Sequence, residues 1–140
     1  MNVFPFLTLK NETRFLLSSW SVRQCMEKME YYKYSTIPLL DENGGYVGTI
    51  SEGDLLRFIK NEAEFDIDRL EKASILDVPR YRDYKTLSME SSLEDLVNLS
   101  MEQNFIPMVD DRNVFMGIIP RRKILEYFKD ELQDYLKEVV

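Results

Sequence analysis

The chain has 140 residues, a net charge of -7 and 44% hydrophobic residues. A chain of this length forms one compact domain, or two small units that share a core. The excess of 25 acids over 18 bases argues against a protein that coats DNA or RNA, although it allows a local basic pocket for a small anion.

The sequence offers few of the residues that commonly carry out catalysis. Histidine is absent, which excludes Ser-His-Asp and Cys-His catalysis and removes the commonest metal ligand. The single cysteine, Cys25, forms no internal disulfide, and its apolar position in a predicted helix indicates a buried side chain. We therefore expect no enzyme and no required cofactor. No apolar run is long enough to span a bilayer and the N-terminus makes a poor secretory signal, so we expect a cytoplasmic protein without a membrane partner.

The first half of the chain predicts an N-terminal arm followed by strand, helix, strand, strand and helix. Residues 1–13 form the arm and residues 15–17 a short strand. Ser19 or Ser21 can cap a helix from Val22 that carries apolar residues at helical spacing. Two strands then flank a turn over residues 41–45, and a helix begins near Ser51.

The second half repeats the first after a charged linker. Residues 61–83 predict short helices near residues 67–70 and 74–78, with Pro79 ending the second. A strand at residues 86–89, a helix from Leu93, a hairpin and a long final helix follow. At a spacing of 69, Pro38 matches Pro107 and Gly48 matches Gly117. A duplicated unit of about 60 residues is small for a core of its own, so we expect the halves to pack sheet to sheet about a pseudo-twofold axis.

The repeat is unequal where its last strand meets its last helix. YVGTISEGDLLRFIK at residues 46–60 returns as FMGIIPRRKILEYFK at residues 115–129, but Ser51 and Asp54 become Pro120 and Lys123. One copy thus carries a hydroxyl and a carboxylate where the other carries positive charge.

STIPLLDENGGYVGTISEGDLL, together with its partial repeat FIPMVDDRNVFMGII, resembles the CBS domain pair, or Bateman module. The resemblance covers roughly residues 7–130 and is closest to the stand-alone CBS pairs of Gram-positive bacteria. It implies an α+β fold of two tandem repeats, each β-α-β-β-α. The expected limits are residues 7–62 for the first repeat, 63–83 for the linker, 84–130 for the second repeat and 131–140 for a C-terminal helix extension.

The resemblance also implies a homodimeric regulatory protein that senses AMP, ADP or ATP in clefts between the repeats and signals to a protein partner. In the first cleft, Asp54 would accept hydrogen bonds from ribose hydroxyls and Ser51 would face phosphate. A carboxylate can accept from two vicinal hydroxyls, and a helix N-terminus offers free N–H groups to phosphate. The remaining expected contacts are Thr36, Ile37, Pro38, Leu16 and the cation Arg14, with Lys10 as a further candidate.

The second repeat departs from the family pattern. A ribose grip is in doubt there, and Arg121, Arg122 and Lys123 at a helix start favour an anion instead. The arginine pair resembles the phosphate-binding arginines of cyclic di-AMP receptors, so cyclic di-AMP is an alternative ligand. Ile106 and Pro107, at the positions of Ile37 and Pro38, are the matching contacts in this repeat.

Simpler interpretations stay open. Ser51 and Asp54 also form a helix-capping pattern that any helix could use. The basic cluster at residues 121–123 could be a solvated surface. A ligand-free dimeric interaction module is a further alternative for the whole protein.

Overall fold

The structure, a computed structural model, describes residues 2–139, which fall into two compact units. The first unit comprises Arg14–Tyr84 and Arg112–Phe115. The second unit comprises the N-terminal residues up to Thr13, then Lys85–Asp111 and the chain from Met116 onward. Each unit is described by itself.

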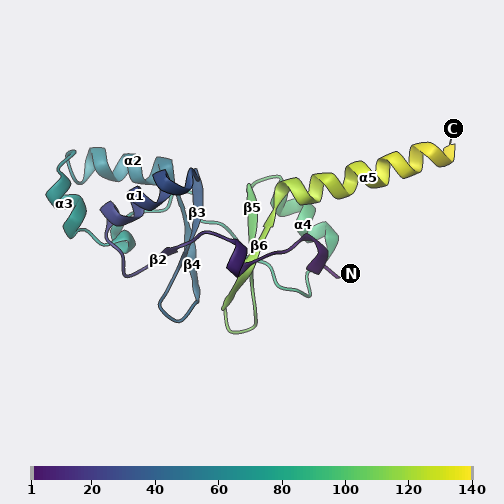
Figure 1. Cartoon of the computed structure of the whole chain (residues 1–140), viewed down its shortest axis with the longest axis horizontal. Helices are drawn as coiled ribbons and strands as arrows, with labels where there is room; N and C mark the ends of the chain where they lie inside the picture. The colour runs from purple at the N-terminus through teal and green to yellow at the C-terminus, as the bar shows by residue number, and fades with distance from the viewer. Residues whose placement is uncertain (1, 140) are drawn as a thin grey trace. The chain divides into compact units, whose positions relative to one another are not determined.

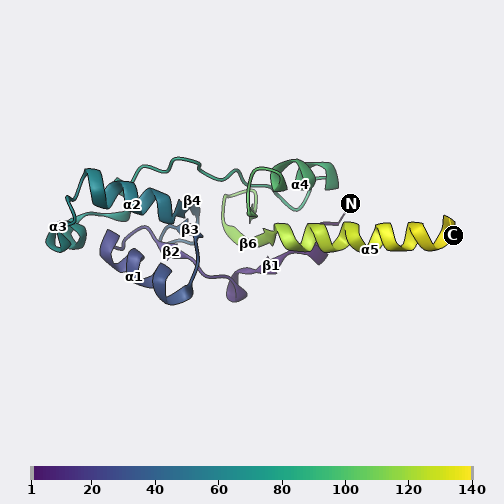
Figure 2. The same cartoon turned by 90° about the horizontal axis from the view of Figure 1, so that it is seen from above.

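A three-stranded sheet of order β2-β3-β4 forms the frame of the first unit (Figure 1). β2 (Leu16–Leu17) runs parallel to β3 (Thr36–Leu40), which pairs antiparallel with β4 (Tyr46–Ser51). The helices α1 (Val22–Tyr32) and α2 (Glu52–Asn61) lie side by side on one face of this sheet (Figures 1 and 2). The core between them includes fully buried Leu16, Val22, Cys25, Ile37, Leu39 and Ile50.

Local sequence explains where the helices of this unit begin and end. Ser21 and Gln24 form a reciprocal capping box at the start of α1, and Lys33 ends that helix in a left-handed conformation. Of the two predicted caps, Ser21 is therefore the one used. The linker forms α3 (Ile67–Lys72) and a short 3-10 helix at Ile75–Asp77, close to the predicted positions.

The second unit has a sheet of order β1-β6-β5, built from β1 (Thr8–Leu9), β5 (Phe105–Val109) and β6 (Phe115–Pro120). Two helices complete it, α4 (Leu93–Ser100) and α5 (Arg121–Val139). The prediction of a strand at residues 86–89 was wrong, because this segment forms only an isolated parallel bridge between Leu87 and Met108. The N-terminal arm instead supplies the third strand, pairing antiparallel with β6. The core of the second unit includes buried Phe6, Leu96, Ile106, Ile119 and Ile124.

Candidate functional site

Asp54 stands at the N-terminus of α2 and is only 2% exposed. Its Oδ2 accepts a hydrogen bond from the backbone N–H of Ser51 at 3.0 Å, and the Ser51 hydroxyl accepts one from the N–H of Asp54 at 3.1 Å. Its Oδ1 accepts two more, from Arg57 Nη2 at 2.7 Å and from the N–H of Tyr81 at 3.0 Å. The expected cap is therefore real, and Asp54 has two further partners that a cap does not require.

Residues 79–84, which we call the 79–84 segment, run along β4 in the first unit. Asp83 Oδ1 accepts from the N–H of Thr49 at 2.9 Å, and its Oδ2 pairs with Arg80 Nε at 2.8 Å. Thr49 faces Pro38 across the hairpin, so its N–H points away from β3 and meets a carboxylate instead of a strand. Asp83 thus satisfies the outer edge of β4 in place of a β-strand.

Tyr46 links the same segment to the sheet. Its hydroxyl lies 2.7 Å from Thr49 Oγ1 and donates to the carbonyl of Tyr84 at 3.2 Å. Burial is the main cause that raises the pKa of the Tyr46 phenol above its usual value, followed by opposing effects that include the hydrogen bond with Thr49 and the charge of Asp83. Tyr46 therefore stays a neutral hydrogen-bonding group at physiological pH.

The remaining predicted residues of the first repeat surround this corner in part. Thr36 is half-buried and lies opposite Ser51 in the hairpin register, which brings it next to the capped end of α2. Leu16, Ile37 and Pro38 are buried in the sheet. The side chain of Arg14 is exposed, and its guanidinium lies 4.9 Å from the centre of the Tyr32 ring.

In the second repeat the two arginines at the start of α5 have different surroundings. Arg121 is half-buried, and its Nε donates to the carbonyl of Ser100 at 2.6 Å, at the C-terminal end of α4. Arg122 is exposed and pairs with Glu126 at 2.8 Å. Ile106 and Pro107 are buried in β5. Arg122 thus lies on the surface, as the solvated alternative expects, whereas Arg121 is partly inserted into its unit.

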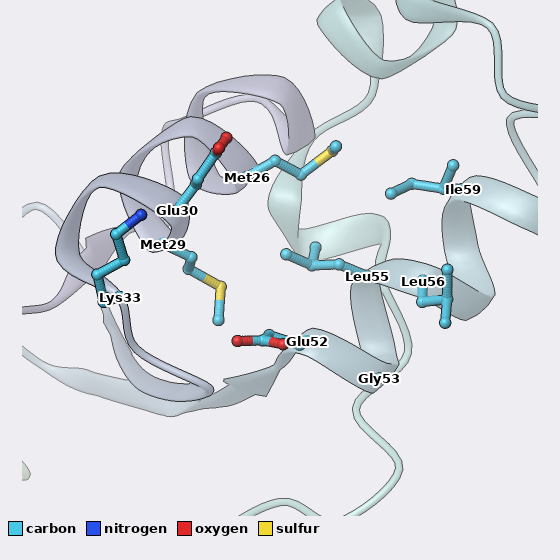
Figure 3. A pocket seen from close by; sticks show the side chains of 9 residues that line it. All are labelled: Met26, Met29, Glu30, Lys33, Glu52, Gly53, Leu55, Leu56 and Ile59. Carbon is cyan, nitrogen blue, oxygen red and sulfur yellow. The ribbon is translucent and has the colours of Figure 1, made fainter.

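An open pocket of about 720 Å³ lies between α1 and α2 in the first unit (Figure 3). Met26, Met29, Leu55, Leu56 and Ile59 form its apolar wall, and Glu30, Lys33, Glu52 and Gly53 complete the lining. Asp54 is not among these residues, although its chain neighbours Glu52, Gly53 and Leu55 are. Met29 is buried in the core and Met26 packs against it, as helical spacing indicates, and both also line this opening.

Sequence reasoning missed Arg57 and the 79–84 segment as parts of the site. The guanidinium of Arg57 bonds Asp54 and also lies 5.2 Å from the centre of the Tyr81 ring. Two signals could have found them. Arg57 follows Asp54 by three residues, which places both on one helix face, and PRYRDY is a charged, aromatic stretch at the end of the linker.

The described part of the chain contains neither a candidate metal site nor a candidate membrane-spanning helix. No group of three or more Cys, Asp or Glu side chains within residues 2–139 could hold a metal ion. None of the helices there has the length and apolar character to cross a bilayer.

A curated relative and several solved structures are similar to this chain. A magnesium and cobalt efflux protein CorC of Buchnera aphidicola is 27% identical over 122 residues, which cover 86% of this chain and 40% of that protein. This chain therefore spans less than half the length of that relative. A crystal structure of CbpB with cyclic di-AMP matches at a TM-score of 0.87 and 20% identity, covering 99% of this chain and 91% of that one.

CbpB of Listeria monocytogenes, also with cyclic di-AMP, matches at a TM-score of 0.82 and 21% identity, covering 94% of this chain and 97% of that one. CBSX2 with AMP matches at 0.72 and 24%, covering 92% and 96%. These likenesses establish the fold, which is that of stand-alone CBS pairs such as those of Gram-positive bacteria. The family model for the CBS domain matches residues 13–61 and 77–130, most of the chain and both repeats. The chain therefore belongs to the CBS domain family.

Proposed function

We propose that this protein is a regulatory module that binds an adenine nucleotide, with Asp54 accepting hydrogen bonds from the ribose. The observation that carries the proposal is the environment of Asp54. The same Ser-x-x-Asp capping box occurs at Ser92 and Asp95, where the aspartate is exposed. Of these two aspartates only Asp54 is buried, although capping requires no burial.

The acceptor capacity of Asp54 supports this role. An ionised carboxylate offers about four acceptor positions, and the bonds from Ser51, Arg57 and Tyr81 occupy three. One position stays available for a single hydroxyl. A grip on two vicinal hydroxyls requires the release of one existing donor, and Arg57, with a 53% exposed side chain, is the cheapest to release.

This competition supplies a physical basis for signalling. Arg57 and the N–H of Tyr81 share one carboxylate oxygen, and the Tyr81 ring packs on the Arg57 guanidinium. A ribose that displaces either donor alters the contacts of the 79–84 segment, and that segment is the surface we propose a partner protein detects. A ligand can shift a conformation only through such a difference in contacts between the two states.

Cyclic di-AMP is the second candidate ligand. It is supported by the likeness to CbpB, two structures of which hold that nucleotide, and by the half-buried Arg121 at the start of α5. In this case Arg121 and Arg122 would contact phosphate, because a guanidinium pairs well with phosphate oxygens. Release of the Arg122–Glu126 pair, which is exposed, would cost little.

The remaining features of the proposal follow from a regulatory role. We infer a non-catalytic homodimer in the cytoplasm that needs no metal and acts on an unidentified protein partner. The expected limits of the two repeats, residues 7–62 and 84–130, belong to this proposal as well.

Calorimetric titration of ligand-stripped protein with AMP, ADP, ATP and cyclic di-AMP tests the function. Asp54→Asn should weaken a ribose-held nucleotide about tenfold or more, because a ligand-facing acceptor is lost. Asp95→Asn is the matched control, since it alters the same capping position without a buried site. Arg121→Ala/Arg122→Ala should weaken cyclic di-AMP selectively. If none of the four nucleotides gives a heat of binding at millimolar concentration, the result would favour the ligand-free interaction module.

A further inference from the structure

The linker after α2 presents two large apolar side chains to solvent. Phe65 is 67% exposed and Ile67 is 56% exposed, where the chain passes from α2 into α3 (Figure 1). Residues 62–76 also lie outside both stretches that the family model matches. The requirements of the CBS fold therefore do not explain why these two side chains are apolar.

This part of the linker is nevertheless firmly packed in the first unit. Ala63 and Leu70, which stand on either side of the exposed pair in the chain, are buried in the core. The N–H of Phe65 donates to the carbonyl of Ile59 at 3.0 Å, and the N–H of Asp66 donates to the carbonyl of Ala63 at 2.8 Å. Phe65 is therefore presented to solvent by a hydrogen-bonded turn that is anchored on both sides.

Phenylalanine is an unfavourable residue for the backbone conformation at this position. The φ of Phe65 is +61°, and the φ of Glu64 before it is +49°. This left-handed region is uncommon for residues with a Cβ and is a clear outlier for a bulky side chain, whereas glycine enters it freely. Neither the backbone nor contact with water favours Phe65, so we look for a role outside the fold.

Acidic side chains alternate with the apolar ones along this stretch. Residues 61–70 carry four acids and one base, a net charge of -3; the acids are Glu62, Glu64, Asp66 and Asp68, and the base is Arg69. All four acids are exposed, and Arg69 lies 3.5 Å from Glu64 and 4.0 Å from Asp66. One cation thus serves two of the carboxylates, and the surface keeps an excess of negative charge. Such a surface attracts a basic partner and repels nucleic acid, an anionic membrane or a second copy of itself.

We propose that residues 62–68, here called the 62–68 surface, dock a basic peptide segment of a partner protein, in which a large apolar residue lies among lysines or arginines. Phe65 is the aromatic anchor, the type of residue that dominates the energy of small interfaces. The acids orient the basic residues of the peptide. Two apolar side chains form a small surface compared with the ~20–30 residues per side of a standard interface, so the occupant is a short segment and its dissociation constant lies on the micromolar scale or above.

Selection from random dodecapeptides displayed on phage, with the full chain as target and no nucleotide present, tests the class of occupant. The recovered peptides should carry a net positive charge and at least one large apolar residue. Synthetic copies of them, titrated by fluorescence anisotropy, should bind the wild-type chain more weakly as salt is raised, because exposed charges are screened.

Substitutions locate the binding to the 62–68 surface. Phe65→Asn should weaken the recovered peptides about tenfold or more, because asparagine tolerates a positive φ but lacks the ring. Tyr31→Ala is the matched control, since it removes an aromatic side chain that is 79% exposed elsewhere in the first unit, and it should leave the dissociation constant within twofold of the wild-type value. Both variants should keep the nucleotide affinity of the wild type, so this test stands whether or not the proposed nucleotide binds.

Phe65→Gly separates docking from folding. Glycine adopts the left-handed conformation freely, so thermal unfolding should shift to higher temperature while peptide binding is lost as in Phe65→Asn. A selection that recovers no binding peptide, recovered peptides without an excess of basic residues, or equal binding to wild type and Phe65→Asn would overturn the proposal. Self-association of the wild-type chain that Phe65→Asn abolishes would assign the 62–68 surface to a second copy and would overturn it as well.

Discussion

Replacement of Gly48 by alanine tests whether the 79–84 segment depends on close contact with β4. A Cβ atom at this position would lie 2.5 Å from Arg80 Nε and 2.6 Å from Asp83 Oδ1. Both distances are too short for atoms that are not bonded, so the two side chains must move away. Movement of Asp83 breaks its bond with the N–H of Thr49 and its pair with Arg80.

The expected cost follows from these two interactions. A hydrogen bond to a charged group contributes about 1.5–3 kcal/mol, and a partly exposed ion pair about 0–1 kcal/mol. Water can reach the released groups in part, and alanine suits a strand slightly better than glycine, which offsets some of the loss. We expect Gly48→Ala to lower the free energy of unfolding by about 1.5 kcal/mol, a fall in Tm of roughly 3–6 °C.

Two other glycines provide matched controls. Gly117 occupies the same place in the second repeat, but with φ at +148° and the Thr8 carbonyl oxygen 2.1 Å from a built Cβ. Because that oxygen is backbone, Gly117→Ala should cost about 3 kcal/mol or more. Gly53 lies in α2, where a built Cβ would lie 3.3 Å from the flexible end of Arg57 and 3.7 Å from Ser51 Oγ, so Gly53→Ala should be neutral or stabilise by up to about 1 kcal/mol. Urea unfolding of the three variants gives the order, and a Gly48→Ala protein as stable as Gly53→Ala would refute the reasoning.

Three further predictions concern the first unit. Burial raises the pKa of the Cys25 thiol from 9.0 to about 12, so the unfolded chain loses this proton first and the free energy of unfolding should fall above pH 9 by about 1.4 kcal/mol per unit. The pH dependence of the urea midpoint measures this slope, and Cys25→Ala should reduce it. Tyr46→Phe removes the hydroxyl shared with Thr49 and Tyr84 and should cost about 1 kcal/mol in the same assay; no change would mean that water replaces these bonds. Ser21→Ala removes the α1 cap and should lower the free energy of unfolding by about 1 kcal/mol, with Ser19→Ala, outside the cap, as the neutral control.

Local patterns made much of the fold predictable. Helical spacing located α1, α2, α4 and α5, and the spacing of 69 between Gly48 and Gly117 identified the repeat. The capping pattern at Ser51 and Asp54 placed the start of α2 correctly. These features depend on residues close together in the chain, where periodicity and turn chemistry are informative.

Contacts between distant segments could not be predicted in the same way. The pairing of β1 with β6 joins residues more than 100 positions apart. Only the structure shows why the second repeat has a glycine at position 117, which has a positive φ and lies against Thr8. The bond between Asp54 and the N–H of Tyr81 also depends on the path of the linker, which spacing does not encode. Arg121 and Arg122 appear equivalent in the sequence, yet only one is half-buried.

Nucleotide titration of Asp54→Asn beside Asp95→Asn is the measurement that tests the central claim most directly. Both substitutions alter an N3 capping aspartate, but only Asp54 is buried against Arg57 and Tyr81. We predict that an adenine nucleotide binds wild-type protein and Asp95→Asn with equal affinity and binds Asp54→Asn at least tenfold more weakly. Equal affinity for all three proteins, while each stays folded, would contradict the assignment of Asp54 to the ribose.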